Sequence, residues 1–133
     1  MTYMLDTNIC IYLVKKQPSQ VLEKLTSLNI QDVCVSAITV GELQYGVAKS
    51  QFPEKNIMAL LKFLVPLTIL PFDSKAALEY GNIRANLELN GTPVGPYDTL
   101  IAAHAVSKNC ILVTNNVKEF QRVAHLKVEN WVK

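Results

Sequence analysis

The sequence has few cysteines and no long apolar run. Its three cysteines, Cys10, Cys34 and Cys110, are odd in number, lie among apolar residues and lack the spacing of zinc ligands. This pattern argues against a disulfide framework and favours buried, reduced thiols. No segment reaches the roughly 20 uninterrupted apolar residues that a membrane span needs, and the N-terminus lacks a basic leader with a long apolar stretch. We therefore expect a soluble, cytoplasmic protein with no membrane contact.

The chain also has little excess charge and no nucleotide-binding glycine loop. The 13 Lys and Arg residues against 11 Asp and Glu residues give a net charge of +2, which permits RNA binding without predicting it. Neither GxxxxGK[ST] nor GxGxxG occurs in the sequence. With 133 residues, 50% of them hydrophobic, the chain suits one compact domain over residues 1–133.

Short apolar runs alternate with helical patterns along the chain. We expect β-strands at residues 2–5, 32–36, 67–70 and 110–114, with a shorter one within 127–132. The intervening segments have helical periodicity or capping signals, at residues 9–16, 19–29, 37–50, 53–65, 74–90 and 97–109. Ser36 and Asp73 are predicted to cap two of these helices. Strands separated by helices require crossover connections. The pattern predicts an α/β fold, a three-layer α/β/α sandwich with a mostly parallel sheet.

Three acidic residues fall where such a fold binds ligands. Asp6 directly follows the first strand, and parallel sheets bind ligands beyond the carboxyl ends of their strands. Glu42 shares a helical stripe with the apolar residues Ile38 and Tyr45, so we expect all three side chains to point inward. Asp98 lies in the first turn of a helix on the same stripe as apolar residues that follow it. Taken singly, Asp6 is more commonly a helix cap and Glu42 is as easily a surface residue, but the three together favour a functional site.

Carboxylates gathered at one edge repel one another, and their pKa values rise unless a cation compensates them. Because the set contains no His or Cys, Mg²⁺ or Mn²⁺ suits it better than zinc. His104, among alanines within a helix, is more commonly a packing residue than a base.

Four motifs in order resemble those of PIN domains, and specifically of VapC-type ribonuclease toxins from toxin-antitoxin pairs. They are MLDTNICIYL, SAITVGELQYGVAKS, GTPVGPYDTLIAAHA and LVTNNVKEFQRV, and the resemblance spans residues 3 to about 123. It implies that Asp6, Glu42 and Asp98 are the catalytic acids that hold Mg²⁺. The family often has a fourth acid where this chain has Asn116, so the resemblance leaves Asn116 and Glu119, one turn further on, as weaker candidate ligands.

Other residues have supporting roles in this interpretation. Thr7, Asn8 and Thr114 are expected to hydrogen-bond the metal-binding carboxylates or a water molecule, although each is equally a terminator of a helix or strand. Candidate contacts to RNA are Arg84, Lys15 and Lys49, although scattered basic residues are usually solvated surface. Arg84 is equally able to pair with an acid.

The resemblance implies a Mg²⁺-dependent endoribonuclease toxin of a type II toxin-antitoxin system. Its expected substrate is structured RNA, with tRNA and the anticodon loop of initiator tRNA as the specific expectation. Expected partners are a VapB-type antitoxin and a second copy of the chain, and exposed Phe52, Met58 and Phe63 would suit either surface. The alternative is a catalytically inactive PIN-like domain that binds protein or RNA. A haloacid dehalogenase-type phosphatase fits poorly, because Asn8 stands where that family has its second acid.

Overall fold

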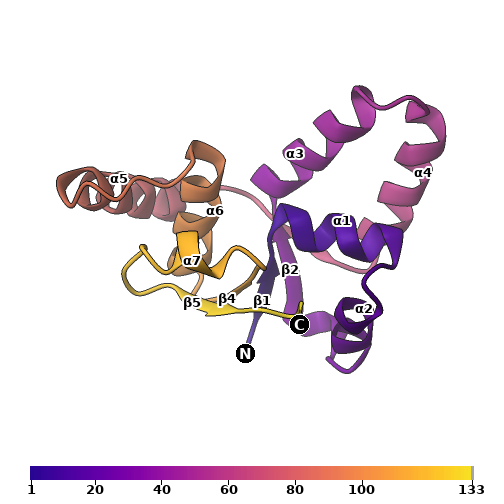
Figure 1. Ribbon diagram of the computed structural model, residues 1–133, viewed down its shortest axis with the longest axis horizontal. Helices are drawn as coiled ribbons and strands as arrows, with labels where there is room; N and C mark the ends of the chain where they lie inside the picture. The colour runs from indigo at the N-terminus through magenta and orange to yellow at the C-terminus, as the bar shows by residue number, and fades with distance from the viewer. Residues whose placement is uncertain (133) are drawn as a thin grey trace.

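The computed structural model describes residues 1–132 and contains a five-stranded sheet with helices on both faces (Figure 1). The strands are β1 (Tyr3–Leu5), β2 (Val33–Ser36), β3 (Thr68–Leu70), β4 (Ile111–Val113) and β5 (Lys127–Glu129). The helices are α1 (Thr7–Lys15), α2 (Ser19–Thr26), α3 (Ala37–Ala48), α4 (Pro53–Leu64), α5 (Ser74–Leu89), α6 (Pro96–Ser107) and α7 (Val117–Phe120), with a short 3-10 helix at Ile30–Asp32.

The sheet has the order β3-β2-β1-β4-β5, and all of its pairings are parallel. From β1 the chain moves outward through β2 to β3, and then crosses to the other side of β1 to form β4 and β5. The strand order therefore reverses between β1 and β4, where parallel sheets bind ligands. Asp6 lies at this point, and its backbone N–H donates to the carbonyl of Val113 at 3.0 Å.

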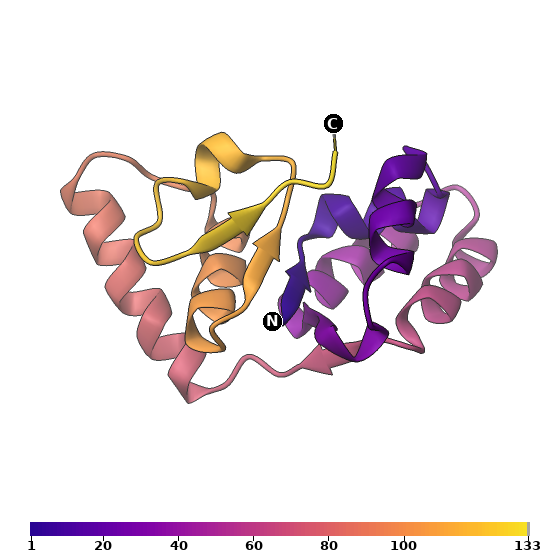
Figure 2. The same ribbon diagram turned by 90° about the horizontal axis from the view of Figure 1, so that it is seen from below.

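Successive residues of the central strands face opposite sides of the sheet and create two cores. Leu5, Val35 and Val113 face the layer formed by α1 to α4. Met4 and Leu112 face the layer formed by α5 to α7. Figure 2 shows the two layers on either side of the strands, joined along one edge by the segment that contains β3.

The helices α1, α3 and α5 each have an N-cap side chain that accepts a backbone hydrogen bond. Asp6 Oδ1 accepts from the N–H of Ile9 at 3.0 Å, and Asp73 Oδ1 accepts from the N–H of Ala76 at 3.0 Å. Ser36 Oγ accepts from the N–H of Ile38 at 3.1 Å and so caps α3. Each bond satisfies a backbone donor that the first helical turn leaves unpaired.

The predicted fold class, strands and principal helices are confirmed, and the three cysteines are free and buried. Two elements were not predicted, the 3-10 helix and α7. The inward orientation expected of Tyr45 is wrong. Tyr45 is 66% exposed, one turn after Glu42 in α3. Phe63 was expected to be exposed but is half-buried against the first core, whereas Phe52 and Met58 are exposed.

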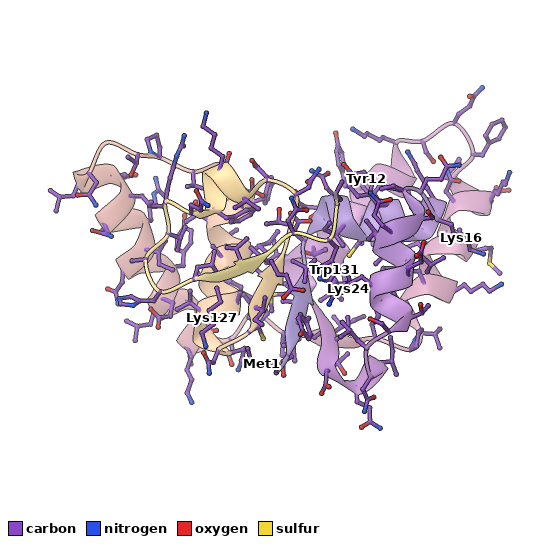
Figure 3. All side chains as sticks on the ribbon, turned by 60° about the horizontal axis from the view of Figure 1, so that its bottom comes forward. Met1, Tyr12, Lys16, Lys24, Lys127 and Trp131 are labelled. Carbon is purple, nitrogen blue, oxygen red and sulfur yellow. The ribbon has the colours of Figure 1, made fainter. Side chains whose placement is uncertain are left out.

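The C-terminal segment joins the two sides of the sheet. Trp131 is 4% exposed and belongs to the core beneath α1 to α4, where its ring lies 6.0 Å from that of Tyr3 between centroids. Its Nε1–H donates to Glu129 Oε1 at 2.8 Å, and the same oxygen lies 3.9 Å from Lys24 Nζ. Figure 3 shows Trp131 and Lys24 where this segment meets α2. Within residues 1–132, no helix is long and apolar enough to span a membrane.

Candidate active site

Asp6 is the most buried of the candidate acids. Asp6 lies at the junction of β1 and α1 and is 5% exposed. Burial is the largest influence on its carboxyl group and raises the pKa, while hydrogen bonds from Thr114 and from the N–H of Ile9 act in the opposite direction. The negative charge of Glu42 raises the pKa further. Asp6 therefore both caps α1 and interacts with a second acid.

Glu42 approaches the same point from α3. Its side chain is half-buried, and Oε1 accepts a hydrogen bond of 2.6 Å from Thr7 Oγ1. Thr7 is the first residue of α1 and directly follows Asp6. This contact ties the carboxylate on α3 to the end of β1. Thr7 thus holds Glu42 in place, while its role in supporting a metal site stays a prediction.

Asp98 and Glu119 bring a second pair of acids from the opposite layer. Asp98 lies in the first turn of α6, and Glu119 lies in α7. Desolvation by burial, followed by the hydrogen bond and charge of Glu119, raises the pKa of Asp98 to about 7, with smaller contributions from Asp6 and Glu42. The carboxylates of Asp6, Glu42 and Glu119 therefore all act on Asp98 at the switch point.

The position of Glu119 distinguishes it from Asn116. Its Oε1 is buried and has no hydrogen-bond partner, and both this oxygen and Asp98 Oδ2 would lie 3.9 Å from a Cβ placed on Gly95. Asn116 is exposed at the N-terminus of α7 and makes no side-chain cap. Of the two weaker candidates, Glu119 therefore shares the acid cluster. A role for Asn116 as a ligand stays a prediction.

Thr114 and Asn8 support the cluster in different ways. Thr114 is fully buried, and its hydroxyl hydrogen-bonds the carboxyl group of Asp6 while accepting from the N–H of Asn116 at 3.0 Å. Asn8 contributes through its backbone N–H, which lowers the pKa of Asp6, whereas its side chain is exposed. The carboxylate oxygens of Asp6 are thus oriented by a hydroxyl that follows β4 and by N–H groups of the first turn of α1.

The three basic candidates lie in different surroundings. Lys15 lines a groove together with Glu42. Lys49 stands over the ring of Tyr45, 4.8 Å from its centroid. Arg84 donates from Nε to Glu88 Oε2 and from Nη1 to the hydroxyl of Tyr80, each at 3.0 Å. Their proposed contacts to RNA stay predictions.

One buried polar contact joins the helices that carry Glu42 and Asp98. His104 Nδ1 lies 2.7 Å from Ser36 Oγ, and both residues are fully buried. His104 also meets the ring of Phe72 edge-on, with 5.4 Å between centroids. It therefore packs within the fold, as expected. The sequence identified Ser36 as a cap but held no signal for its second partner, 68 residues away.

The donor set has the chemistry of a hard-cation site. All four side chains offer carboxylate oxygens, the ligands that Mg²⁺ and Mn²⁺ prefer, and Glu119 Oε1 has no donor. Over residues 1–132, however, no three acidic, His or Cys side chains are arranged so that they could hold a metal ion as they stand. The residues fit Mg²⁺ by their chemistry and neighbourhood, and binding would require the carboxylates to turn toward a common centre.

Comparisons with known proteins identify the family. The sequence profile of the PIN domain matches residues 3–126. The chain is 50% identical to Ribonuclease VapC2 of Haemophilus influenzae over 130 residues, 98% of each chain. It is 45% identical to the tRNA(fMet)-specific endonuclease VapC of Salmonella typhimurium over 129 residues, 97% of each.

Solved structures agree in fold. The VapBC2 complex of Rickettsia felis, bound to a DNA fragment from its promoter, contains a chain that matches with a TM-score of 0.93 at 44% identity, covering 99% of this chain and 100% of that one. DNA-bound VapBC of Salmonella typhimurium matches with a TM-score of 0.94 at 44% identity, covering 99% of each chain. Sequence and fold agree: this chain belongs to the PIN domain family, among the VapC-type toxins.

Proposed function

We propose that this protein is a Mg²⁺-dependent endoribonuclease toxin of a type II toxin-antitoxin system. The observation that carries the proposal is the meeting of four carboxylates at the switch point, where Asp98 has a pKa of about 7. Relatives named as ribonucleases support the activity. Two relatives named as tRNA(fMet)-specific endonucleases support initiator tRNA as the substrate, and we propose its anticodon loop as the site of cleavage. Such a target would place the activity in the cytoplasm, where translation occurs.

Asp6, Asp98, Glu42 and Glu119 would hold the metal ion. A bound Mg²⁺ supplies a water of lowered pKa and neutralises charge that builds up on the phosphodiester during in-line attack. Thr7 keeps Glu42 oriented, while Thr114 and the N–H of Ile9 orient Asp6. Burial and the neighbouring Glu119 raise the pKa of Asp98 to about 7, and a cation bound beside Asp98 would favour its ionised form.

We also propose a VapB-type antitoxin as partner and a homodimer as the basic assembly. A groove of about 370 Å³ runs between α1, α3 and α4, has largely apolar walls and includes Glu42 and Lys15. An apolar antitoxin segment that filled this groove could extend a basic side chain to the acids, which would welcome it for the same reason as a metal ion. Solved relatives are VapBC complexes, two of them bound to DNA. Exposed Phe52 and Met58 on and beside α4 are candidates for either contact.

The alternative function is an inactive PIN-like module that only binds a partner or RNA. A module of that kind has no need to keep four carboxylates close together at an energetic cost in repulsion and desolvation. The cluster therefore favours catalysis over binding alone.

The test is cleavage of purified tRNA by the antitoxin-free protein, with Mg²⁺ and with excess EDTA. We expect cleavage only with Mg²⁺ and products that end in a 3′-hydroxyl and a 5′-phosphate, because a metal-activated water attacks in line. A 2′,3′-cyclic phosphate would instead indicate attack by the ribose hydroxyl. A folded protein that cuts no RNA in either condition would favour the binding module.

A further inference from the structure

A second pocket lies in the α5–α7 layer, beside the helical turn that carries Asp98. It has a volume of about 310 Å³ and lies between α5, the loop before α6 and the first turn of α6. We call it the Arg84 pocket. Its walls include the apolar residues Leu87, Pro93, Val94 and Pro96. They also include Tyr80 and the ion pair of Arg84 with Glu88, so a bound anion would lie beside one carboxylate as well as the guanidinium.

The Arg84 pocket and the acid cluster share a wall. Pro96 and Thr99 line the pocket and flank Asp98 in the first turn of α6. Gly95, the residue before this turn, faces the acids, since a Cβ added there would lie 3.9 Å from oxygens of both Asp98 and Glu119. An RNA strand that crossed this loop would pass from the acid cluster to the Arg84 pocket.

The shared wall is held in place from two sides. Thr99 Oγ1 donates to the carbonyl of Gly95 at 2.8 Å, and Arg122 Nη1 donates to the carbonyl of Pro93 at 2.8 Å. The N–H of Thr92 donates to the carbonyl of Leu87 at 3.0 Å. A pocket preformed in this way does not require its ligand to order the loop, which lowers the entropic cost of binding.

The polar groups of the pocket suit an anion that carries a flat apolar face. Arg84 has five N–H donors, and its contacts to Glu88 and Tyr80 use two of them. Prolines and Val94 supply apolar walls against which a base can lie. The volume is at the lower end of the range of about 300–1,000 Å³ for small-ligand pockets, which suits a single nucleotide.

A simple surface ion pair explains less of this arrangement. Arg84 and Glu88 are four residues apart on an exposed helix, and such pairs contribute little to stability. That pairing accounts neither for the hydrogen bond to Tyr80 nor for the position of both side chains in a pocket that borders the acids. The four carboxylates and the Mg²⁺ they would hold act only at the scissile phosphodiester, so a cationic side chain beside them would help to hold the neighbouring phosphate.

We propose that the Arg84 pocket binds a nucleotide of the RNA substrate next to the scissile phosphodiester, with Arg84 on a phosphate and the apolar walls against the base. This inference rests on the proposed function and adds the site that holds the substrate. Arg84 would bind RNA without taking part in the chemical step.

Binding of a fluorescein-labelled RNA stem–loop, measured by anisotropy in the non-cleaving Asp98→Asn protein, tests the proposal. We expect Arg84→Ala in this background to raise Kd about tenfold, the value of one charge-assisted phosphate contact. The slope of log affinity against log salt should fall by about 0.7, as for one phosphate of a single strand. Lys75→Ala, which removes the same charge from the first turn of α5, is the matched control and should change Kd by less than about twofold.

The conservative variant Arg84→Lys separates charge from geometry and should recover part of the affinity, because it keeps the charge but loses the planar fork. In the active protein, Arg84→Ala should raise KM more than it lowers kcat. Equal Kd values for the Arg84→Ala and Lys75→Ala proteins would overturn the proposal, and so would a folded Asp98→Asn protein that binds no RNA. Arg84-dependent binding by a wild-type protein that never cuts RNA would sustain the pocket while refuting the nuclease assignment.

Discussion

The two helical layers differ in what they leave open. The α1–α4 layer is closed by large branched side chains such as Leu43 and Leu60, yet it leaves two apolar grooves, one beside Glu42 and one between α1, α2 and α4. The α5–α7 layer uses small residues, Ala102 and Ala105 among them, that let α6 pack closely within its core. Its pocket beside the acids is lined by an arginine and a tyrosine.

This difference indicates that the two layers bind different partners. We associate the apolar grooves with a protein partner and the polar pocket with RNA. Each layer contributes two acids to the cluster, Asp6 and Glu42 from one and Asp98 and Glu119 from the other. The acid cluster therefore forms only where the two layers meet, and its geometry depends on the contacts that hold the layers together.

The largest expected effect comes from removing one acid of either layer. Asp6→Ala and Asp98→Ala should each lower the rate of tRNA cleavage by more than about 100-fold, because even the outer partners of metal ligands typically contribute 10–100-fold. Circular dichroism should show an intact fold. Asp32→Ala, which removes an exposed acid of the 3-10 helix, is the control and should retain activity. An active, folded Asp98→Ala protein would refute the assignment.

The C-terminal segment offers a way to loosen the layers. Trp131→Ala should lower the free energy of unfolding by about 3–5 kcal/mol, because it empties a buried position in the α1–α4 core. Urea denaturation measures the change. Lys24→Ala, which removes only the partly exposed ion pair to Glu129, should cost about 1 kcal/mol or less. Equal losses in the two variants would mean that the buried ring stabilises this segment no more than the ion pair does.

The sequence predicted most of this arrangement, because apolar runs, caps and strand ends are local signals. Asp6, Ser36 and Asp73 were recognised as caps. Asp6 was placed at a strand end, Asp98 in a first helical turn and Glu42 on an inward stripe of its helix. Contacts between residues far apart in the chain could not be predicted in this way. The contact of Glu119 with Asp98 required α7, a single turn too short for a periodic pattern, and the orientation of Tyr45 depends on where α3 leaves the core.

The contact between Ser36 and His104 tests the junction itself. Ser36→Ala removes a helix cap and leaves a buried imidazole nitrogen without a partner, so we expect a loss of about 2 kcal/mol in the free energy of unfolding. Ser27→Ala is the control, because Ser27 is exposed and bonds only within its own turn. The control should stay within about 0.5 kcal/mol of the wild type. A neutral Ser36→Ala variant would show that the layers do not depend on this contact.

The smallest effect concerns pH. The folded-state pKa of Asp98, about 7, lies above its ordinary value of 3.8, so the folded protein binds more protons than the unfolded chain between these values. In EDTA, stability should therefore fall as pH rises from about 4 to 7, by about 1 kcal/mol once solvent screening is allowed for. Urea midpoints at several pH values should show this slope in the wild type and a shallower one in Asp98→Asn. A stability that instead rises through this range would contradict the account.

The most direct test of the acid cluster as a metal site is Mn²⁺ binding by the antitoxin-free protein, followed by electron paramagnetic resonance. The account predicts saturable binding that Asp6→Asn and Asp98→Asn each weaken by more than about tenfold, as expected for loss of a ligand. Asp32→Asn should leave it unchanged. Absence of saturable binding, or equal binding by all four proteins, would contradict the claim that carboxylates from both layers hold one catalytic metal.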